Sequence, residues 1–340
     1  MRIAQIAPLF ETVPPRRYGG TERVVSWLTE ALVAAGHDVT LFASGDSTTS
    51  ARLVPVVPQA RRFVPNFEAN NAPYCRMLEL VAREAKNFDV LHFHIDFHPF
   101  PLFSRLGAPF LTTLHGRMDQ EWTQSIYSLF PDAPLVSISE SQRRPAPDLG
   151  WAGTVHHGMP ADLLRPVANG GDYLAFLGRI SPEKGIDGAI RIAQRYRMKL
   201  KVAAKVGEED RAWHNQAMAP LLAGGGVEFI GEIDDAQKPA FLSNARALLF
   251  PIAWPEPFGL VMIEAMACGC PTVAYNLGSV PEVIEDGRTG FIVRNEDEAV
   301  GALGRIGELD RAAIRARFEQ RWSSARMADD YVTIYKKLAG

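Results

Sequence analysis

Charged side chains follow two apolar runs in the second half of this 340-residue chain. Arg179 and Lys184 lie in the stretch Gly178–Gly185, which comes directly after the apolar run Tyr173–Leu177. Arginine offers a rigid fork of donors and lysine a mobile point charge, a combination that suits the divided charge of a diphosphate. The alternative is a solvent-exposed turn in which the arginine pairs with Glu183.

Two carboxylates stand eight residues apart further along. Glu256 lies in a loop before a predicted helix, and the free N–H groups of Phe258, Gly259 and Leu260 at the helix start can hold hydroxyls or phosphate oxygens. Glu256 beside them would accept hydrogen bonds from sugar hydroxyls. Glu264, inside an otherwise apolar helix, needs a partner, and a ribose diol would serve; a core carboxylate satisfied by a backbone or arginine donor is the alternative.

A glycine pair precedes the first predicted helix. In the stretch 18–22, Gly19 and Gly20 would let the backbone approach a phosphate closely, and Thr21 is the expected cap of the helix. The pattern does not match G-x-G-x-x-G, and no acidic residue ends the second strand, so no nicotinamide or flavin site is expected.

Histidines gather after two other predicted strands. His92, His94, Asp96 and His98 come within one residue of the H-x-H-x-D-H metal motif of metallo-β-lactamase-like hydrolases. The extra residue breaks the register and no downstream cluster completes a metal centre, so they are interpreted as polar residues that line a cleft. His115, at a strand end beside a glycine, is a better catalytic candidate, although a structural histidine is the alternative.

The elements that must position these residues form two series of alternating strands and helices, which is typical of parallel α/β sheets. The second series restarts after Gly158–Gly171, a stretch without sustained periodicity that we predict to join two doubly wound domains. The predicted strands are 3–8, 38–43, 90–93, 110–114, 135–139, 173–177, 200–204, 227–230, 247–251, 271–274 and 290–293. The predicted helices are 21–35, 75–87, 119–127, 186–197, 236–243, 259–267 and 323–338.

Composition excludes several classes of protein. A net charge of −3 argues against nucleic acid as the main partner, and three cysteines without metal-ligand spacing favour a reducing cytoplasm. No apolar run is long enough to span a membrane. Arg61, Arg62, Phe63 and Phe67 could touch an anionic membrane surface weakly, but Pro65 interrupts any helix there and a solvated loop is favoured.

Taken together, these motifs resemble the retaining glycosyltransferases of family 4. The family has the α/β GT-B fold, with two Rossmann-like doubly wound parallel-sheet domains facing across a cleft. The resemblance implies an acceptor domain at 1–162, to which a C-terminal helix at 323–340 returns, and a nucleotide-sugar domain at 163–322. The matching stretches are 19–22, Leu114-His115-Gly116, 137–140, Gly178-Arg179 with Lys184-Gly185, Gly231-Glu232, Glu256 with Glu264, and 278–282 with Gly290-Phe291.

By this resemblance, Arg179 and Lys184 would neutralise the leaving diphosphate, and His115 would contact the donor sugar near the reacting carbon. Other residues would bind substrate: the donor hexose at Glu256 and the amides of Phe258, Gly259 and Leu260, the ribose at Glu264, the base near Glu232 and Ile233, the phosphate near Gly19 and Gly20, with His94 and Asp96 in the cleft. The family commonly has Asn-Gly where this chain has His157-Gly158, which leaves the acceptor open.

The expected reaction is metal-independent, cofactor-free transfer of a hexose with retention of anomeric configuration, in the cytoplasm. UDP-glucose is the first expected donor and GDP-mannose the second, and the acceptor would be a glycan, a lipid-linked sugar or a small molecule. Other readings are a GT-B phosphorylase or epimerase, or a protein that binds a nucleotide sugar without catalysis.

Overall fold

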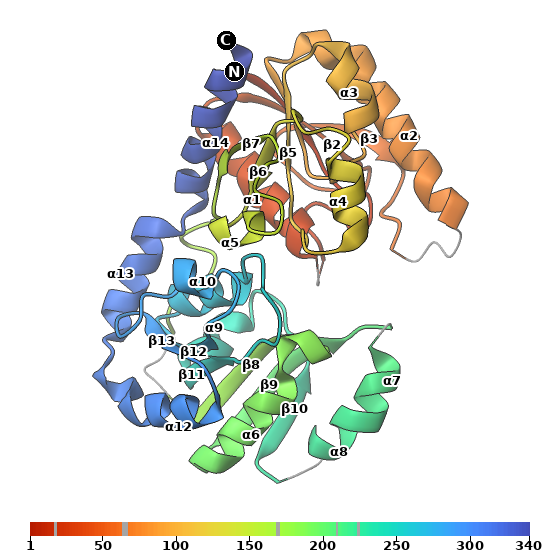
Figure 1. The fold of residues 1–340 in the computed structure, drawn as a ribbon. Coiled ribbons are helices and arrows are strands. Elements are labelled where there is room, and N and C mark those ends of the chain that lie inside the picture. The colour runs from red at the N-terminus through yellow and green to blue at the C-terminus, as the bar shows by residue number, and fades with distance from the viewer. Residues whose placement is uncertain (17–18, 63–66, 168–170, 209, 223–224) are drawn as a thin grey trace. The chain divides into compact units, whose positions relative to one another are not determined.

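The computed structural model describes residues 1–16, 19–62, 67–167, 171–208, 210–222 and 225–340. These residues form two compact units, Met1–Met159 with Ser323–Gly340 and Pro160–Trp322. Each unit is built on one wholly parallel sheet with helices packed on it (Figure 1). Tyr18, Phe63, Pro65 and Gly170, which entered the predictions above, lie outside the described residues.

The first unit contains a seven-stranded sheet in the order β3-β2-β1-β4-β5-β6-β7. The strand order reverses between β1 and β4, and this is where doubly wound sheets open a crevice at the carboxyl ends of their strands. Its strands are β1 (Arg2–Ile6), β2 (Asp38–Ser44), β3 (Arg52–Val57), β4 (Val90–Phe93), β5 (Phe110–Thr113), β6 (Leu135–Ser137) and β7 (Trp151–Thr154).

Among the described residues of this unit, six α-helices accompany the sheet. The C-terminal helix α14 packs against α1 and β4, and the blue ribbon beside α1 in Figure 1 shows it. Ser323 caps α14 by accepting a hydrogen bond from the N–H of Arg326. The helices are α1 (Gly20–Ala34), α2 (Phe67–Glu84), α3 (Phe100–Leu106), α4 (Glu121–Tyr127), α5 (Glu140–Arg143) and α14 (Ser324–Ala339).

The second unit contains a six-stranded sheet in the order β10-β9-β8-β11-β12-β13, which reverses between β8 and β11. Its strands are β8 (Tyr173–Ile180), β9 (Lys199–Val206), β10 (Val227–Gly231), β11 (Ala245–Phe250), β12 (Thr272–Tyr275) and β13 (Gly290–Val293). Its helices are α6 (Ile186–Tyr196), α7 (Arg211–Trp213), α8 (Ala219–Leu222), α9 (Lys238–Ser243), α10 (Leu260–Ala267), α11 (Val280–Val283), α12 (Glu296–Arg305) and α13 (Arg311–Arg321).

Two local predictions are wrong. Helix α1 begins at Gly20 with Gly19 as its cap residue, so Thr21 lies inside the first turn; glycine is itself an acceptable cap residue. Strand β8 continues through Arg179, because residues 178–180 pair with 204–206 of the equally extended β9. Arg179 therefore lies in the last paired residues of β8 and β9 rather than in a free loop.

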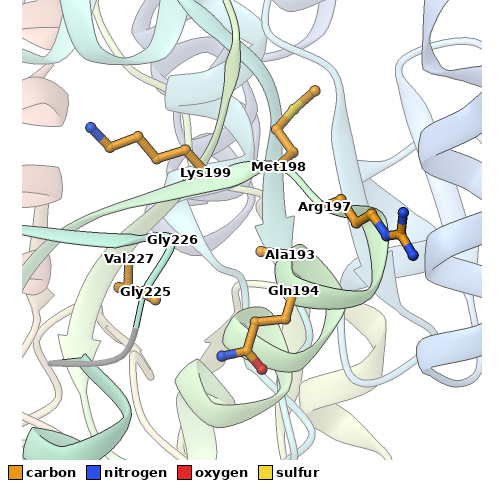
Figure 2. Close-up of a pocket in the computed structure, with 8 residues that line it drawn as sticks. All are labelled: Ala193, Gln194, Arg197, Met198, Lys199, Gly225, Gly226 and Val227. Carbon is orange, nitrogen blue, oxygen red and sulfur yellow. The ribbon is translucent and has the colours of Figure 1, made fainter.

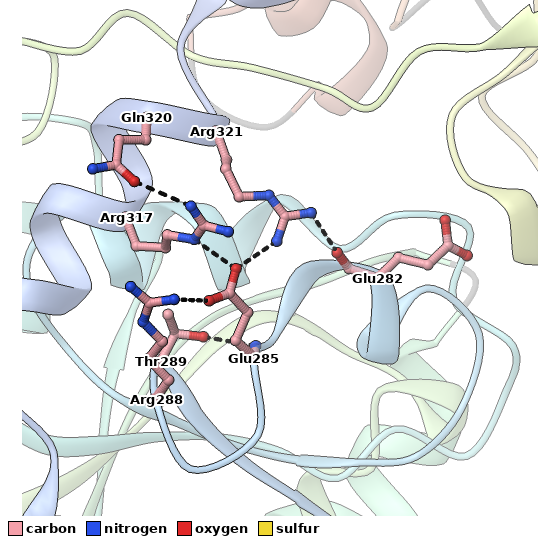
Figure 3. A network of polar contacts seen from close by, with 7 residues as sticks. All are labelled: Glu282, Glu285, Arg288, Thr289, Arg317, Gln320 and Arg321. Atoms are coloured by element: carbon pink, nitrogen blue, oxygen red, sulfur yellow. Dashed lines mark hydrogen bonds and ion pairs between the residues drawn. The ribbon is translucent and has the colours of Figure 1, made fainter.

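Helix α13 is held by a cluster of arginines around one carboxylate (Figure 3). Glu285 accepts hydrogen bonds from Arg317 at 2.6 Å, Arg321 at 2.7 Å and Arg288 at 3.2 Å. Partial burial opposes ionisation of Glu285, but the arginines outweigh it and its pKa lies below the usual range. This network therefore has a structural role: it ties α13 to the segment that follows α11.

The cysteines are free, and the two in Cys268-Gly-Cys270 are buried, as the sequence predicts. None of the described helices is both long and apolar enough to cross a membrane. Of the residues considered for contact with a membrane surface, Arg62 forms an ion pair with Glu11, and the side chain of Phe67 is not among those that the structure describes.

Candidate functional site

Arg179 is placed at the carboxyl end of β8 between two carboxylates. Its NH2 group lies 2.5 Å from Oε1 of Glu183, and its Nε lies 3.4 Å from Oδ2 of Asp210. Partial burial opposes ionisation of Glu183, but hydrogen bonds from its own N–H, from Arg179 and from Ser181 outweigh it, so the pKa of this carboxyl is lowered. The alternative pairing with Glu183 is thus present, and it holds the guanidinium in place at the strand end.

Lys184 meets Glu256, 72 residues further along the chain. The Nζ of Lys184 lies 2.5 Å from Oε2 of Glu256, which also accepts a hydrogen bond from Trp254 Nε1 at 2.9 Å. The N–H of Ala253 donates to the carbonyl of Glu183 at 2.9 Å and so joins the two loops. The two motifs singled out separately in the sequence therefore form one site at the carboxyl ends of β8 and β11, where the strand order reverses and doubly wound sheets open a crevice.

The backbone at Gly278 and Ser279 packs closely against the loop that carries Glu256. The N–H of Ser279 donates to the carbonyl of Glu256 at 3.0 Å, and the Ser279 hydroxyl donates to the carbonyl of Phe258 at 2.7 Å. Gly278 has φ +58°, and a Cβ there would lie 2.4 Å from both N and O of Glu256. Only glycine fits this approach of two backbone segments.

We expect the Gly278→Ala substitution to lower the melting temperature clearly more than Gly287→Ala. Both positions have positive φ, but a Cβ at Gly287 would meet nothing within 4 Å. The control should show only the backbone strain, about 1 kcal/mol or roughly 2–4 °C for a unit of this size. Differential scanning calorimetry measures both, and equal shifts would mean that the Glu256 loop yields without cost.

Glu264 has a cation partner in the protein. It is buried in α10, and its Oε1 accepts a hydrogen bond at 2.7 Å from Nζ of Lys238, a buried residue of α9 that also lies 2.9 Å from Asp235. The alternative interpretation, in which Glu264 is a core carboxylate with a donor in the protein, is therefore partly correct. The donor is a lysine and not the expected arginine or backbone N–H. A second oxygen of Glu264 remains to accept from a ligand, since a carboxylate has about four lone-pair directions.

The remaining residues that were predicted to bind the sugar nucleotide in this domain lie in the same unit. Phe258 is buried and its ring packs on Trp322, so only its backbone can face a ligand. Gly259 caps α10 at φ +79°, and the Met262 N–H donates to its carbonyl at 3.0 Å, while the amides before Met262 precede the regular hydrogen bonds of the helix. Glu232 is exposed just after β10, and Ile233 is partly buried beside it.

In the first unit, the buried His92, His94 and His157 and the partly buried His115 form one group that extends from α14 to the end of β5. His92 Nδ1 lies 2.7 Å from the Tyr335 hydroxyl, and His92 Nε2 lies 2.7 Å from Thr113 Oγ1. His94 lies between Gln5 and His115, and the His115 ring stacks on that of His157 at 5.3 Å. The prediction that His92 and His94 line a cleft is wrong, because both are buried and hydrogen-bonded inside the unit.

Burial keeps these imidazoles neutral. Desolvation lowers the pKa of His115 to about 3, and it lowers the pKa of His92 and His94 well below their usual range. Among the described residues, no group of three or more histidine, cysteine, aspartate or glutamate side chains could hold a metal ion. His98 is bonded to the carbonyl of Ile95, and Asp96 is partly buried with φ +51°.

Glu22, two residues after the glycine pair, is a buried carboxyl group. Burial raises its pKa to about 6, against a hydrogen bond from its own N–H that lowers it. Gly20 is exposed at the start of α1 and Gly19 is partly exposed. The glycine pair is therefore open to a ligand while the acid beside it is not.

Glu22→Gln should stabilise the protein at pH 7.5 by about 2 kcal/mol and not at pH 4. The carboxyl pKa is higher in the folded state than the unfolded value of 4.5, so the wild type loses stability as the pH rises through about 6. Urea unfolding at the two pH values measures this, and an equal difference at both would contradict it.

A separate pocket of about 520 Å³ lies at the other end of the strands of the second sheet, away from Arg179 and Lys184 (Figure 2). Arg197 follows the end of α6, while Lys199 and Val227 are the first residues of β9 and β10. It therefore opens at the amino ends of the strands, where doubly wound sheets do not place their ligands.

Comparison with known proteins identifies the family. Residues 18–147 match the family described as Glycosyltransferase Family 4, and residues 166–320 match Glycosyl transferases group 1. The chain belongs to glycosyltransferase family 4. It is therefore a glycosyltransferase with the GT-B fold, as the motifs predict.

Relatives of this glycosyltransferase match along most of its length. It is 28% identical over 95% of the chain to a phosphatidyl-myo-inositol mannosyltransferase of Mycolicibacterium smegmatis, of which it covers 88%. Sucrose-phosphate synthase of Thermosynechococcus elongatus has a similar structure, with a TM-score of 0.79, 20% identity and 99% of each chain covered. Anabaena HepE, solved in complex with UDP and glucose, gives a TM-score of 0.74 at 17% identity, with 99% of this chain and 100% of that chain covered.

Proposed function

We propose that this glycosyltransferase transfers a hexose from a nucleoside diphosphate sugar to a hydroxyl group, with retention of anomeric configuration and without a metal ion. The observation that carries the proposal is the pair of cations at the β8–β11 crevice. Arg179 and Lys184 are held there by carboxylates of the protein itself, at the end of the sheet where ligands bind. A diphosphate would replace these carboxylates as the partner of both cations.

The cations would act mainly when the glycosidic bond breaks. Negative charge then builds on the leaving phosphate oxygen, and fixed positive charges stabilise that state more than the ground state. The acceptor hydroxyl would attack the same face of the sugar that the phosphate leaves. Its proton would pass to the leaving phosphate oxygen, so that no protein base is needed.

The other site residues would bind the rest of the donor. Glu256, with the amides of Gly259 and Leu260, suits the hexose hydroxyls, because it already lies against the loop that holds Lys184. Glu264 suits a ribose diol, since its ion pair with Lys238 fixes one carboxylate oxygen and the other oxygen can accept hydrogen bonds. That His115, Gly19 and Gly20 contact the donor stays a prediction of the resemblance.

We propose UDP-glucose as the first donor to test and GDP-mannose as the second. Anabaena HepE, whose structure holds UDP and glucose, supports the former, and the mannosyltransferase relative supports a mannose donor. The name of the same relative gives phosphatidyl-myo-inositol as its acceptor, so we include vesicles that contain this lipid in the acceptor screen.

Thermal-shift measurements with UDP, GDP and ADP and their sugars test the donor class. We expect the nucleotides of one of the three bases to raise the melting temperature of the protein, because a ligand that binds only the folded state stabilises it. AMP and inorganic phosphate are the controls for weak anion binding. If none of the three diphosphates raises the melting temperature above these controls, the donor proposal is wrong.

Transfer should continue in EDTA at full rate. The side chains of Arg179 and Lys184 supply the positive charge that a divalent ion supplies elsewhere. The rate of nucleoside diphosphate release is measured with and without the chelator. Loss of activity that Mn²⁺, Mg²⁺ or Zn²⁺ restores would reject metal independence.

A further inference from the structure

Gln5, on β1 of the first unit, lies at the centre of the buried histidine group. Its side chain is fully buried, and it pairs with His92 in the ladder between β1 and β4. Its Oε1 lies 2.8 Å from Nε2 of His94, and its Nε2 lies 3.1 Å from the Tyr335 hydroxyl. One amide therefore links two branches of hydrogen bonds.

The directions of these bonds are fixed by the amide. The Oε1 atom can only accept, so Nε2 of His94 carries the proton of that neutral ring. The Nδ1 of His94 is then an acceptor, and it lies 2.9 Å from Nε2 of His115. His115 must therefore donate, and its own proton sits on Nε2.

The second branch of hydrogen bonds starts at the amide nitrogen of Gln5. The amide nitrogen of Gln5 donates to Tyr335, whose hydroxyl donates to Nδ1 of His92. The other nitrogen of His92 then donates to Thr113 Oγ1, which in turn lies 2.8 Å from the Tyr331 hydroxyl. The amide nitrogen of Gln5 also lies 3.4 Å from Nδ1 of His92.

We infer that Gln5 is a positioning residue, which acts through His94 to hold His115 as the tautomer with its proton on Nε2. The unprotonated Nδ1 of His115 has no hydrogen-bond partner within the part of the chain that the structure describes. It is thus kept as an acceptor, ready for a hydroxyl group of a ligand. This inference rests on the proposed function only for the step in which that hydroxyl belongs to the donor sugar.

The tautomer can be measured without substrate. Two-bond ¹⁵N–¹H correlation spectra of protein labelled at its eight histidines distinguish protonated from unprotonated ring nitrogens. A His115→Gln variant assigns the His115 signals. We expect Nε2–H in the wild type, and a His115 that carries its proton on Nδ1 would overturn the inference whether or not any variant folds.

Variants separate positioning from stability. Gln5→Met removes both amide contacts and should give His115 as a mixture of tautomers, with kcat lowered roughly tenfold and the dissociation constant for the nucleotide unchanged. Tyr335→Phe breaks the other branch of the same buried network and should leave the His115 spectrum and kcat as in the wild type. If Tyr335→Phe changes the His115 tautomer as Gln5→Met does, or if neither changes it, Gln5 does not position His115. A protein that shows the expected spectra but transfers no sugar would instead reject the proposed function alone.

Discussion

Replacement of Arg179 with alanine is expected to abolish detectable sugar transfer, a loss of at least about a thousandfold in kcat. The Arg179 guanidinium is the rigid member of the cation pair at the β8–β11 crevice, and its loss removes an ion-pair partner of Glu183 and Asp210 and the positive charge proposed to face the diphosphate. The release of nucleoside diphosphate under saturating donor measures this rate.

The matched control is Arg191→Ala in the same unit. Arg191 also pairs with two carboxylates, Asp187 and Glu296, but on the exposed side of α6. Its removal should leave the rate within about twofold, because exposed ion pairs contribute little. Wild-type turnover by the Arg179 variant would reject its role at the leaving group, and equal losses in both variants would indicate a general effect on folding.

The second large effect is expected at the buried pair of Lys238 and Glu264. Lys238→Met should lower the free energy of unfolding by about 3–5 kcal/mol, because it removes one partner of a buried ion pair and leaves Glu264 in the core without its lysine. The double variant Lys238→Met with Glu264→Leu should regain most of that stability, since an apolar pair of similar size can replace a buried ion pair. Urea unfolding measures both.

This pair of variants also separates stability from binding. The double variant should stay stable yet bind the nucleotide weakly, because Glu264 is the proposed ribose ligand. Lys199→Met, which removes an exposed partner of Glu228, is the control and should change stability by less than about 1 kcal/mol. Full nucleotide affinity in the stable double variant would mean that Glu264 serves the core and not the ligand.

The strands with a strong apolar pattern could be predicted from the sequence. The strands 90–93 and 290–293 have the predicted bounds, because both are short, mostly buried apolar runs bounded by turn signals. Strand β4 lies in the interior of its sheet, and β13 lies at the edge of the other sheet, where α12 packs on it. Strand β3 was not predicted. It lies at the sheet edge with a half-exposed pattern and contains Pro55, which only an edge strand tolerates.

Helix α13 was also not predicted, for a related reason. It buries little besides Ile314 and Phe318, and its arginines are fixed by distant partners such as Glu285, so its apolar stripe is too narrow to show a period. Helical periodicity reveals only the helices that bury a broad face.

The types of the site residues could be predicted, but their partners could not. The motif around Arg179 and Lys184 and the two glutamates were recognisable from type and spacing. That Lys184 meets Glu256, or that Lys238 meets Glu264, depends on strand order, which places residues far apart in sequence at one crevice. Gln5 carried a weak signal: it sits on the first strand beside a strand with histidines at alternate positions, which share one face.

The most direct test of the donor site is an isothermal titration of the nucleoside diphosphate that the thermal-shift screen selects, into wild type and Lys184→Ala, both in EDTA. We predict one site per wild-type chain and an affinity at least about tenfold lower for the variant, since a lysine–phosphate contact of this kind contributes roughly 1.4 kcal/mol or more. Equal affinity of the two proteins, or binding that requires a divalent ion, would contradict the central claim that the protein's own cations hold the diphosphate.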